Sequence, residues 1–316
     1  MTGPLSVVID TDPGLDDALA LFIACASPEF DVLGVTTVAG NVGLDNVTRN
    51  ALRILDFAGR ADVPVIAGAD RPLRRPPIEA GGIHGGDGLG GLPLPNSSRT
   101  AATGAADWMA TLLRQRPSGS VRLLALGPLT NIAALIEAAP DAAAHIGEVI
   151  AMGGAVRDRG NVTPFAEFNI HADPEAADIV LRSGVALTLI PLDLTRQVAA
   201  DPAWGARLAA AGGKAAAISA QLVDAYLANI ARYRAARGDA GPPQTTFPLH
   251  DPCVMLHLID RTLFAGETLP LSIPCAGARD GATVIDAREG RPARILFVAE
   301  APRALALAHR RIASLT

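Results

Sequence analysis

The sequence lacks the features of a disulfide-rich, membrane-spanning or nucleic-acid-binding chain. Its three cysteines, Cys25, Cys253 and Cys275, are odd in number and far apart, which is typical of buried free thiols in a reducing compartment. No apolar run approaches the ~18 residues that a membrane span needs. No basic region precedes the first apolar run, so we expect no signal peptide and a cytoplasmic protein. A net charge of −5 without a basic stripe argues against nucleic-acid and anionic-membrane partners.

What the sequence does contain is enough apolar material for one large core, since 49% of its 316 residues are hydrophobic. Short apolar runs alternate with alanine-rich segments of helical period, and the apolar runs show no polar alternation. This pattern predicts a single α/β domain over residues 1–316, with a mostly parallel central sheet and helices on both faces. The expected strands are 5–10, 32–39, 63–67, 121–126, 148–152 and 186–190, and the expected helices are 15–26, 46–58, 101–114, 131–139 and 174–183.

The later part of the chain is predicted to be mainly helical before it returns to strands. Residues 201–237 are rich in alanine, and Gly212-Gly213 should divide them into two helices. A loop rich in glycine and proline, 238–248, follows, and we expect this late helical region to act as a lid. The remaining expected elements are a helix at 250–259, strands at 272–274, 282–286 and 294–298, and a helix from Pro302.

The most informative segment carries four aspartates within eight residues, between an apolar run and an amphipathic one. Asp10 ends the first expected strand, Asp12 lies in the turn that leaves it, and Asp16 and Asp17 begin the next helix after Pro13-Gly14. One or two of them could serve as helix caps, but four exceed what one helix end can use. Four close carboxylates repel one another unless a cation holds them, so the segment predicts a hard divalent metal at the carboxyl end of the sheet.

Two further segments carry residues suited to chemistry. His250-Asp251-Pro252 precedes a late helix; Asp251 is either its N-cap or a metal ligand, and His250 titrates near neutrality and could protonate a leaving group. The loop that contains Asn161, Glu167 and Asn169 offers two amides and a carboxylate, which suit sugar hydroxyls, although asparagines also favour turns.

Single residues after other strands complete the candidate set. Asn41 follows the second strand and could simply make a turn, and Leu126 ends a strand where its carbonyl could face a calcium ion. His84 lies in the glycine-rich stretch 81–88, which we expect to be a loop. We include it among the expected substrate contacts.

Together these motifs resemble the inosine-uridine-preferring nucleoside hydrolase family, over essentially the whole chain. The motifs that carry the resemblance are Asp10-Thr11-Asp12-Pro13-Gly14-Leu15-Asp16-Asp17, Val38-Ala39-Gly40-Asn41-Val42, Gly127-Pro128-Leu129-Thr130-Asn131, Met152-Gly153-Gly154, Glu167-Phe168-Asn169 with Asp173-Pro174-Glu175-Ala176-Ala177, and His250-Asp251-Pro252. The resemblance implies a Rossmann-like fold, a bound Ca²⁺, and hydrolysis of ribonucleosides to free base and ribose. It also implies a homodimer or homotetramer.

The resemblance also implies roles for individual residues. Calcium would be held by the side chains of Asp12, Asp17 and Asp251 and by the carbonyl of Leu126. Asp12 would also be the general base, and His250 would protonate the leaving base. Ribose would be held by Asp16, Asn41, Glu167 and Asn169, with Asn161 beside them.

Recognition of the nucleobase is less well specified by the sequence. The two tyrosines, Tyr226 and Tyr233, lie in the late helical region and are candidates to stack on the base, although ordinary helix packing explains them as well. Neither Trp108 nor Trp204 falls near a motif. We therefore expect mixed or pyrimidine-leaning specificity rather than purine stacking between tryptophans.

Two other functions compete with this hypothesis. A Mg²⁺-dependent phosphohydrolase also places an Asp-x-Asp pair after its first strand, but it needs lysine or arginine for the phosphate, and the motifs contain none. A non-catalytic nucleoside- or calcium-binding protein would not need a general base such as Asp12. An assay for free base and ribose separates these alternatives.

Overall fold

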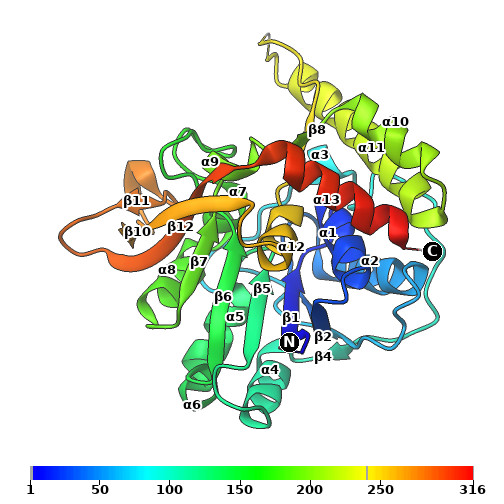
Figure 1. Cartoon of the computed structure of the whole chain (residues 1–316). Helices are drawn as coiled ribbons and strands as arrows, with labels where there is room; N and C mark the ends of the chain where they lie inside the picture. Colours follow the sequence, from blue (N-terminus) through cyan, green and yellow to red (C-terminus); the bar gives the residue numbers. More distant parts are fainter. Residues whose placement is uncertain (1–2, 240, 316) are drawn as a thin grey trace.

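A ten-stranded sheet forms the centre of the computed structural model, which describes residues 3–239 and 241–315 (Figure 1). A separate two-stranded sheet joins β8 and β9. The strands are β1 Leu5–Thr11, β2 Phe30–Thr37, β3 Val65–Ala67, β4 Ala102–Thr103, β5 Val121–Ala125, β6 Ile146–Met152, β7 Leu187–Ile190, β8 Ala199–Ala200, β9 Phe247–Pro248, β10 Phe264–Ser272, β11 Val284–Ile285 and β12 Arg291–Ala299.

Helices connect most of these strands. They are α1 Leu15–Cys25, α2 Leu44–Phe57, α3 Gly81–His84, α4 Ala105–Arg114, α5 Thr130–Ala138, α6 Pro140–Ala143, α7 Phe168–Ala172, α8 Pro174–Arg182, α9 Leu192–Thr195, α10 Pro202–Ala210, α11 Lys214–Ala236, α12 Pro252–Ile259, α13 Ala301–Ser314 and the short 3₁₀ turn η1 Gly277–Arg279. None of these helices is long and apolar enough to cross a membrane, within the residues the model describes.

The strand order places the first strand at the middle of the sheet. The order is β11-β10-β12-β7-β6-β5-β1-β2-β3-β4, and β1 pairs in parallel with both β2 and β5. Strands β2, β3 and β4 therefore extend the sheet on one side of β1, and the chain then returns to add β5, β6 and β7 on the other side. In such sheets ligands bind at the carboxyl ends of the strands where the direction reverses. The mostly parallel α/β sheet predicted from the sequence is confirmed.

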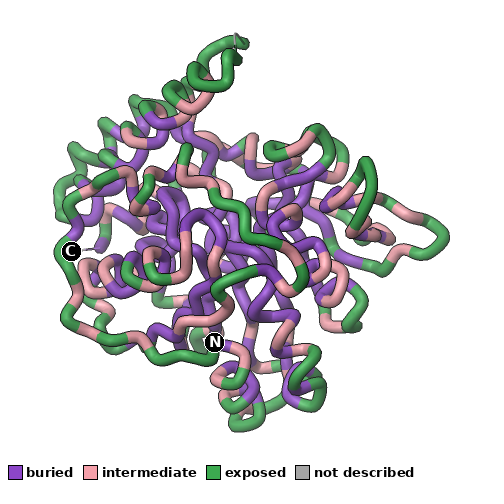
Figure 2. The backbone as a smooth tube through the Cα atoms, turned by 180° about the vertical axis from the view of Figure 1, so that it is seen from behind, coloured by how far each residue is buried: buried purple, intermediate pink, exposed green. Residues whose placement is uncertain are grey.

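Two apolar cores sandwich the sheet, one on each face. One core includes α1, α2, α11, α12 and α13, and the other includes α4, α5, α6 and α8. The buried stretches of the chain gather in the middle of the molecule (Figure 2). Helix α1 is buried on every side over Leu15–Ala24, which matches its nearly continuous apolar sequence. Since this helix starts directly after β1, its first turn carries Asp16 and Asp17 into the interior of the molecule.

Most boundaries match the sequence expectations, and the differences have local causes. Helix α4 starts at Ala105 rather than at 101, because Gly104 precedes it with φ 84°, a left-handed conformation that breaks the helix. The expected break at Gly212-Gly213 separates α10 from α11, with φ 79° and 87°. The stretch expected as a loop around His84 contains the short helix α3, and His84 is buried in it.

Candidate active site

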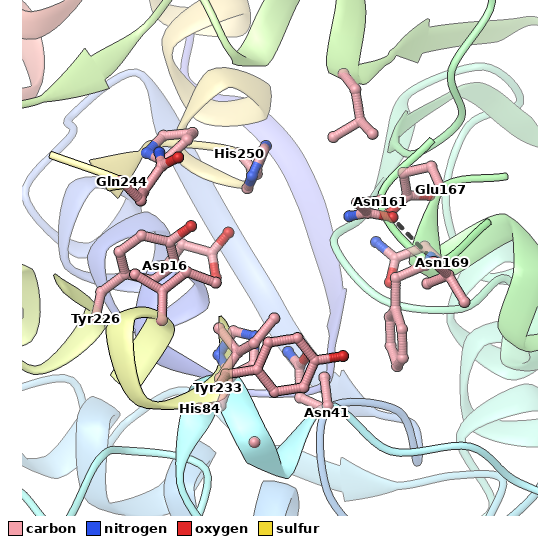
Figure 3. A pocket seen from close by; sticks show the side chains of 18 of the residues that line it. Asp16, Asn41, His84, Asn161, Glu167, Asn169, Tyr226, Tyr233, Gln244 and His250 are labelled. Atoms are coloured by element: carbon pink, nitrogen blue, oxygen red, sulfur yellow. Dashed lines mark hydrogen bonds between the residues drawn. The ribbon is translucent and has the colours of Figure 1, made fainter. Parts of the chain in front are cut away.

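A cavity of about 850 Å³ lies at the carboxyl ends of the central strands, and every substrate contact predicted from the sequence lines it (Figure 3). In Figure 3, Asn161, Glu167 and Asn169 lie on one side of the cavity, and Asp16, Tyr226 and His250 lie on the other. Leu126 and Asp251 also line it. The predicted residues that line the cavity are Asp16, Asn41, His84, Leu126, Asn161, Glu167, Asn169, Tyr226, Tyr233, His250 and Asp251.

Asp12 is fully buried, and its carboxylate is held from one side only. The backbone N–H of Asn41 donates to its Oδ2 at 2.7 Å, whereas its Oδ1 has no hydrogen-bond partner among the described residues. Gly40 and Gly127 leave the space for this carboxylate, since a Cβ on either would lie 2.1 Å from Oδ2 or 2.6 Å from Oδ1. An orphaned buried carboxylate oxygen is costly unless a ligand pairs with it.

The other acidic residues converge from the two ends of the chain. Carboxylate oxygens of Asp16, Asp17 and Asp251 lie within 4.8 Å of one another, and all three residues are buried. The sequence separation is large, but α12 packs against α1, which brings Asp251 beside the first turn of α1. Asp12 is not part of this closest group.

Asp17 is fixed by groups of its own turn. Thr11 Oγ1 donates to its Oδ1 at 2.5 Å, and the Gly14 N–H donates to its Oδ2 at 2.9 Å. The side-chain amide of Asn41 bridges two of the acidic residues, because its Nδ2 donates to the Asp12 carbonyl at 3.1 Å and to Asp17 Oδ2 at 3.2 Å. Asn41 thus holds the acidic turn in addition to lining the cavity.

Within the described part of the chain, no basic side chain compensates the negative charge that these four carboxyl groups carry when they are ionised. Burial raises the pKa of Asp16 to about 8, with repulsion from Asp17 as the next cause. Burial also raises the pKa values of Asp12 and Asp251, helped by the neighbouring aspartates, and it raises that of Asp17 despite the hydrogen bond from Thr11. No lysine or arginine among the described residues forms an ion pair with these four.

These residues fit a hard divalent cation. Carboxylate and carbonyl oxygens are the donors that Ca²⁺ prefers, and a cation would pair with the orphaned Asp12 Oδ1 and relieve the mutual repulsion. Leu126 directly follows β5 and lines the same cavity. Asn169 Nδ2 donates to the Leu126 carbonyl at 2.7 Å, which leaves the second lone pair of the oxygen for another partner.

The opposite wall is organised around Glu167. Its carboxylate caps α7, since it accepts from the N–H groups of Asn169 at 3.0 Å and Ile170 at 3.2 Å, and it also accepts from Gly154 N–H at 2.9 Å. Burial raises the pKa of Glu167 to about 7. Asn161 lies on the exposed loop that ends at this cap (Figure 3). The wall therefore presents a carboxylate and two amides, a combination that can donate to and accept from sugar hydroxyls.

Two histidines, His84 and His250, line the cavity. His84 Nδ1 accepts from the Leu15 N–H at 3.1 Å, which places the ring proton on Nε2, and burial lowers its pKa to about 4. His250 Nδ1 lies 2.7 Å from Thr195 Oγ1. Burial lowers the pKa of His250 to about 3, with the positive charge of Arg196 as a second cause.

The tyrosines from α11 occupy different places. The Tyr226 ring stacks on Phe247 with centroids 4.2 Å apart, so that one of its faces is already covered. Burial raises the pKa of its hydroxyl, which lies close enough to Asp16 for that charge to contribute. Tyr233 lies over α3, and a Cβ on Gly82 would come within 2.6 Å of its ring.

Some cavity residues were not anticipated from the sequence. Gln244 and Thr246, from the segment expected as a lid, line the cavity together with Arg196 and Phe168. Gln244 Nε2 donates to the Thr246 carbonyl at 2.8 Å, which leaves its carbonyl oxygen available. The lid itself stays a prediction; residue 240 lies outside the described residues.

The chain is similar to known proteins over nearly its whole length. The family model described as inosine-uridine preferring nucleoside hydrolase matches residues 7–306. An inosine-uridine preferring nucleoside hydrolase of Leishmania major is 38% identical over 292 residues, 92% of this chain and 90% of that protein. A pyrimidine-specific ribonucleoside hydrolase RihA of Salmonella arizonae is 40% identical over 285 residues, 89% of this chain and 88% of that protein.

Solved structures give the same picture. A plant nucleoside hydrolase, the PpNRh1 enzyme, superimposes with a TM-score of 0.89 at 34% identity, and covers 98% of this chain and 99% of its own. A purine-preferring ribonucleoside hydrolase from Gardnerella vaginalis superimposes with a TM-score of 0.88 at 30% identity, and covers 98% of both chains.

Proposed function

The chain belongs to the inosine-uridine preferring nucleoside hydrolase family, and from this premise we propose that it cleaves ribonucleosides with the help of bound calcium. It is a hydrolase acting on N-glycosyl bonds, and its products are a free base and ribose. The observation that carries the calcium proposal is the buried cluster of Asp16, Asp17 and Asp251, together with the buried Asp12 Oδ1 that has no hydrogen-bond partner among the described residues. The proposed ligands are Asp12, Asp17, Asp251 and the Leu126 carbonyl.

Asp12 has the geometry of a general base. Its Oδ2 is fixed by Asn41. Its Oδ1, the oxygen that would contact the cation, keeps a second lone pair that can accept a proton from a water molecule that attacks the sugar. When bound, calcium would supply Lewis-acid activation of that water and a fixed contact for sugar hydroxyls. The surrounding carboxylates stabilise the positive charge that develops on the sugar as the glycosidic bond breaks, an effect that grows where water is excluded.

We propose that different parts of the cavity bind the sugar and protonate the departing base. Asn161, Glu167 and Asn169 are proposed to hold the ribose hydroxyls from one side of the cavity, and Asp16 and Asn41 also line the cavity and are proposed to contact the sugar. His250 lies on the other side and is proposed to give a proton to the departing base. His84, Tyr226 and Tyr233 are the proposed base contacts.

We propose mixed or pyrimidine-leaning specificity. No tryptophan is among the described residues that line the cavity: Trp204 packs in the core, where it donates to the Leu305 carbonyl, and Trp108 lies against Gly34. The polar side chain of Gln244 offers a hydrogen-bond acceptor instead of a second stacking surface. The similarity to RihA proteins that are named pyrimidine-specific supports this direction.

The specificity proposal is tested by a substrate panel. With uridine, cytidine, inosine and adenosine, we expect release of ribose from each substrate tested at rates that favour uridine, measured as kcat/KM by a reducing-sugar assay. A kcat/KM for adenosine or inosine that exceeds that for uridine by tenfold or more would contradict the proposed specificity. Hydrolysis of a phosphate ester, with no cleavage of any of the four nucleosides, would contradict the proposed function.

Calcium is expected to raise the Tm more at about pH 8 than at about pH 5. Burial and repulsion between the aspartates raise the folded-state pKa values of the proposed ligands Asp12 and Asp251 well above about 4. Without a cation, the folded protein therefore keeps protons that the unfolded chain releases above about pH 4, and stability falls as pH rises. Calcium displaces those protons, so its contribution grows with pH. Thermal unfolding with calcium and with a chelator measures the difference, and the same gain at both pH values would contradict the site.

We also propose a cellular compartment and an oligomeric state for the enzyme. The predicted burial holds only for Cys253, since Cys25 and Cys275 are partly exposed. All three cysteines are free thiols, which supports the proposed reducing, cytoplasmic compartment. Gel filtration with light scattering tests the predicted homodimer or homotetramer.

A further inference from the structure

The ring of His250 is anchored by a residue that lies 55 positions earlier in the chain. Thr195 Oγ1 lies 2.7 Å from His250 Nδ1, and Thr195 has no exposed surface. Among residues 3–239 and 241–315, this is the hydroxyl's one hydrogen-bond partner. Thr195 does not line the cavity, whereas His250 does.

The backbone around both residues is fixed by the same pair of segments. Helix α9 ends at Thr195 and leads into β8, which pairs antiparallel with β9 just before His250. The Leu249 N–H donates to the Val198 carbonyl at 2.8 Å, and the Cys253 N–H donates to the His250 carbonyl at 3.2 Å. The main chain of His250 is therefore held on both sides, so the orientation of its ring depends on rotation about its side-chain bonds.

We propose that Thr195 is a positioning residue that holds the ring of His250 with Nε2 directed at the departing base. The two ring nitrogens lie on different edges of the imidazole, so a contact that ties Nδ1 to the wall turns Nε2 toward the cavity. A hydroxyl donates to an unprotonated Nδ1 and accepts from a protonated one. The contact is therefore available to either tautomer of the ring. This inference rests on the proposed role of His250.

The variants Thr195→Val and Thr195→Ser separate this role from simple packing. Valine keeps the volume and removes the hydroxyl, and serine restores the hydroxyl without the methyl group. With Thr195→Val we expect kcat for uridine to fall on the order of 10-fold to 10²-fold, the range that misplacement of a catalytic group costs. Thr195→Ser should return kcat to within a few-fold of the parent enzyme.

The leaving group supplies the discriminating measurement. An activated substrate, 4-nitrophenyl riboside, leaves as a stable phenolate and needs no proton, so Thr195→Val should leave its kcat within about twofold of the parent. Thr188→Val is the matched control. Thr188 is buried on β7 and donates to Glu148 Oε1 at 2.6 Å, away from the cavity, so its loss should change neither rate.

The outcomes are distinguishable. Equal losses on both substrates with Thr195→Val, or no loss on uridine, would overturn the positioning role, as would failure of serine to restore the rate. His250→Ala measured in parallel isolates the underlying proposal. If that variant shows the leaving-group selectivity and Thr195→Val does not, only the inference about Thr195 fails, whereas equal losses with His250→Ala remove the acid role on which the inference rests.

Discussion

Replacing Asp12 by asparagine is expected to lower kcat for uridine by at least about 10³-fold. General-base assistance alone typically contributes about 10²–10⁴-fold, and the same substitution removes a proposed calcium ligand. Asparagine is nearly isosteric, so the space that Gly40 and Gly127 leave for this side chain remains filled. Steady-state kinetics with saturating calcium measure the loss.

A matched substitution separates chemistry from stability. Glu148 is a partly buried carboxylate on β6 that pairs with Arg261, and it does not line the cavity. Glu148→Gln should therefore leave kcat within a few-fold of the parent enzyme. If Asp12→Asn retained more than about a tenth of the parent kcat, another group would have to be the base.

The second large effect is expected for His250→Ala, and it depends on the substrate. For uridine and inosine, kcat should fall by about 10²–10⁴-fold, because the departing base needs a proton and His250 is the proposed donor. For 4-nitrophenyl riboside, kcat should change by less than about threefold, because its leaving group is stable as an anion.

The comparison of the two substrates is the test of the acid role. A structural defect would lower both rates together, and so would loss of calcium from the neighbouring Asp251. Measured calcium content of the variant separates these causes: a fully loaded variant with equal losses on both substrates would remove His250 from the mechanism.

The part of the site formed by Asp12, Asp17, Asn41 and Leu126 could be predicted from the sequence, because these residues lie at the ends of strands and in turns with strong local signals. Asp12 and Asp17 flank a Pro-Gly turn between an apolar strand and an apolar helix, and parallel strands bring their carboxyl ends to one edge of the sheet. Asn41 and Leu126 follow strands that pair with β1 on either side, so their positions follow from strand order.

Other contacts around the cavity could not be predicted, because they join segments that are far apart in the chain. Thr195 lies in a four-residue helix with no signal of its own, and its partner His250 is identified only once β8 and β9 pair. Gln244 lies in a segment whose glycines and prolines indicate only a loop. The stacking of Tyr226 on Phe247 likewise depends on how α11 packs over β9.

The last strands show the limit of local patterns for the fold. The strand expected at 272–274 is wrong: β10 runs over Phe264–Ser272 and shares only Ser272 with it. This strand contains Gly266, Glu267 and Pro270, which weaken a strand signal, and its register shifts between Ala265 and Gly266 where it pairs with β12. Such residues are tolerated in β10 because it is antiparallel and lies near the edge of the sheet.

The central claim is that one cation joins Asp12 to Asp17 and Asp251, while Asp16 serves the sugar. Calorimetric titration of chelator-treated protein with Ca²⁺ tests it most directly, on the parent chain and on Asp12→Asn and Asp16→Asn. We predict one site per chain, an affinity reduced at least about tenfold in Asp12→Asn, and an affinity nearly unchanged in Asp16→Asn. Full binding by Asp12→Asn with loss of binding by Asp16→Asn would contradict the account, since the ion would then belong to the closer group of Asp16, Asp17 and Asp251 alone.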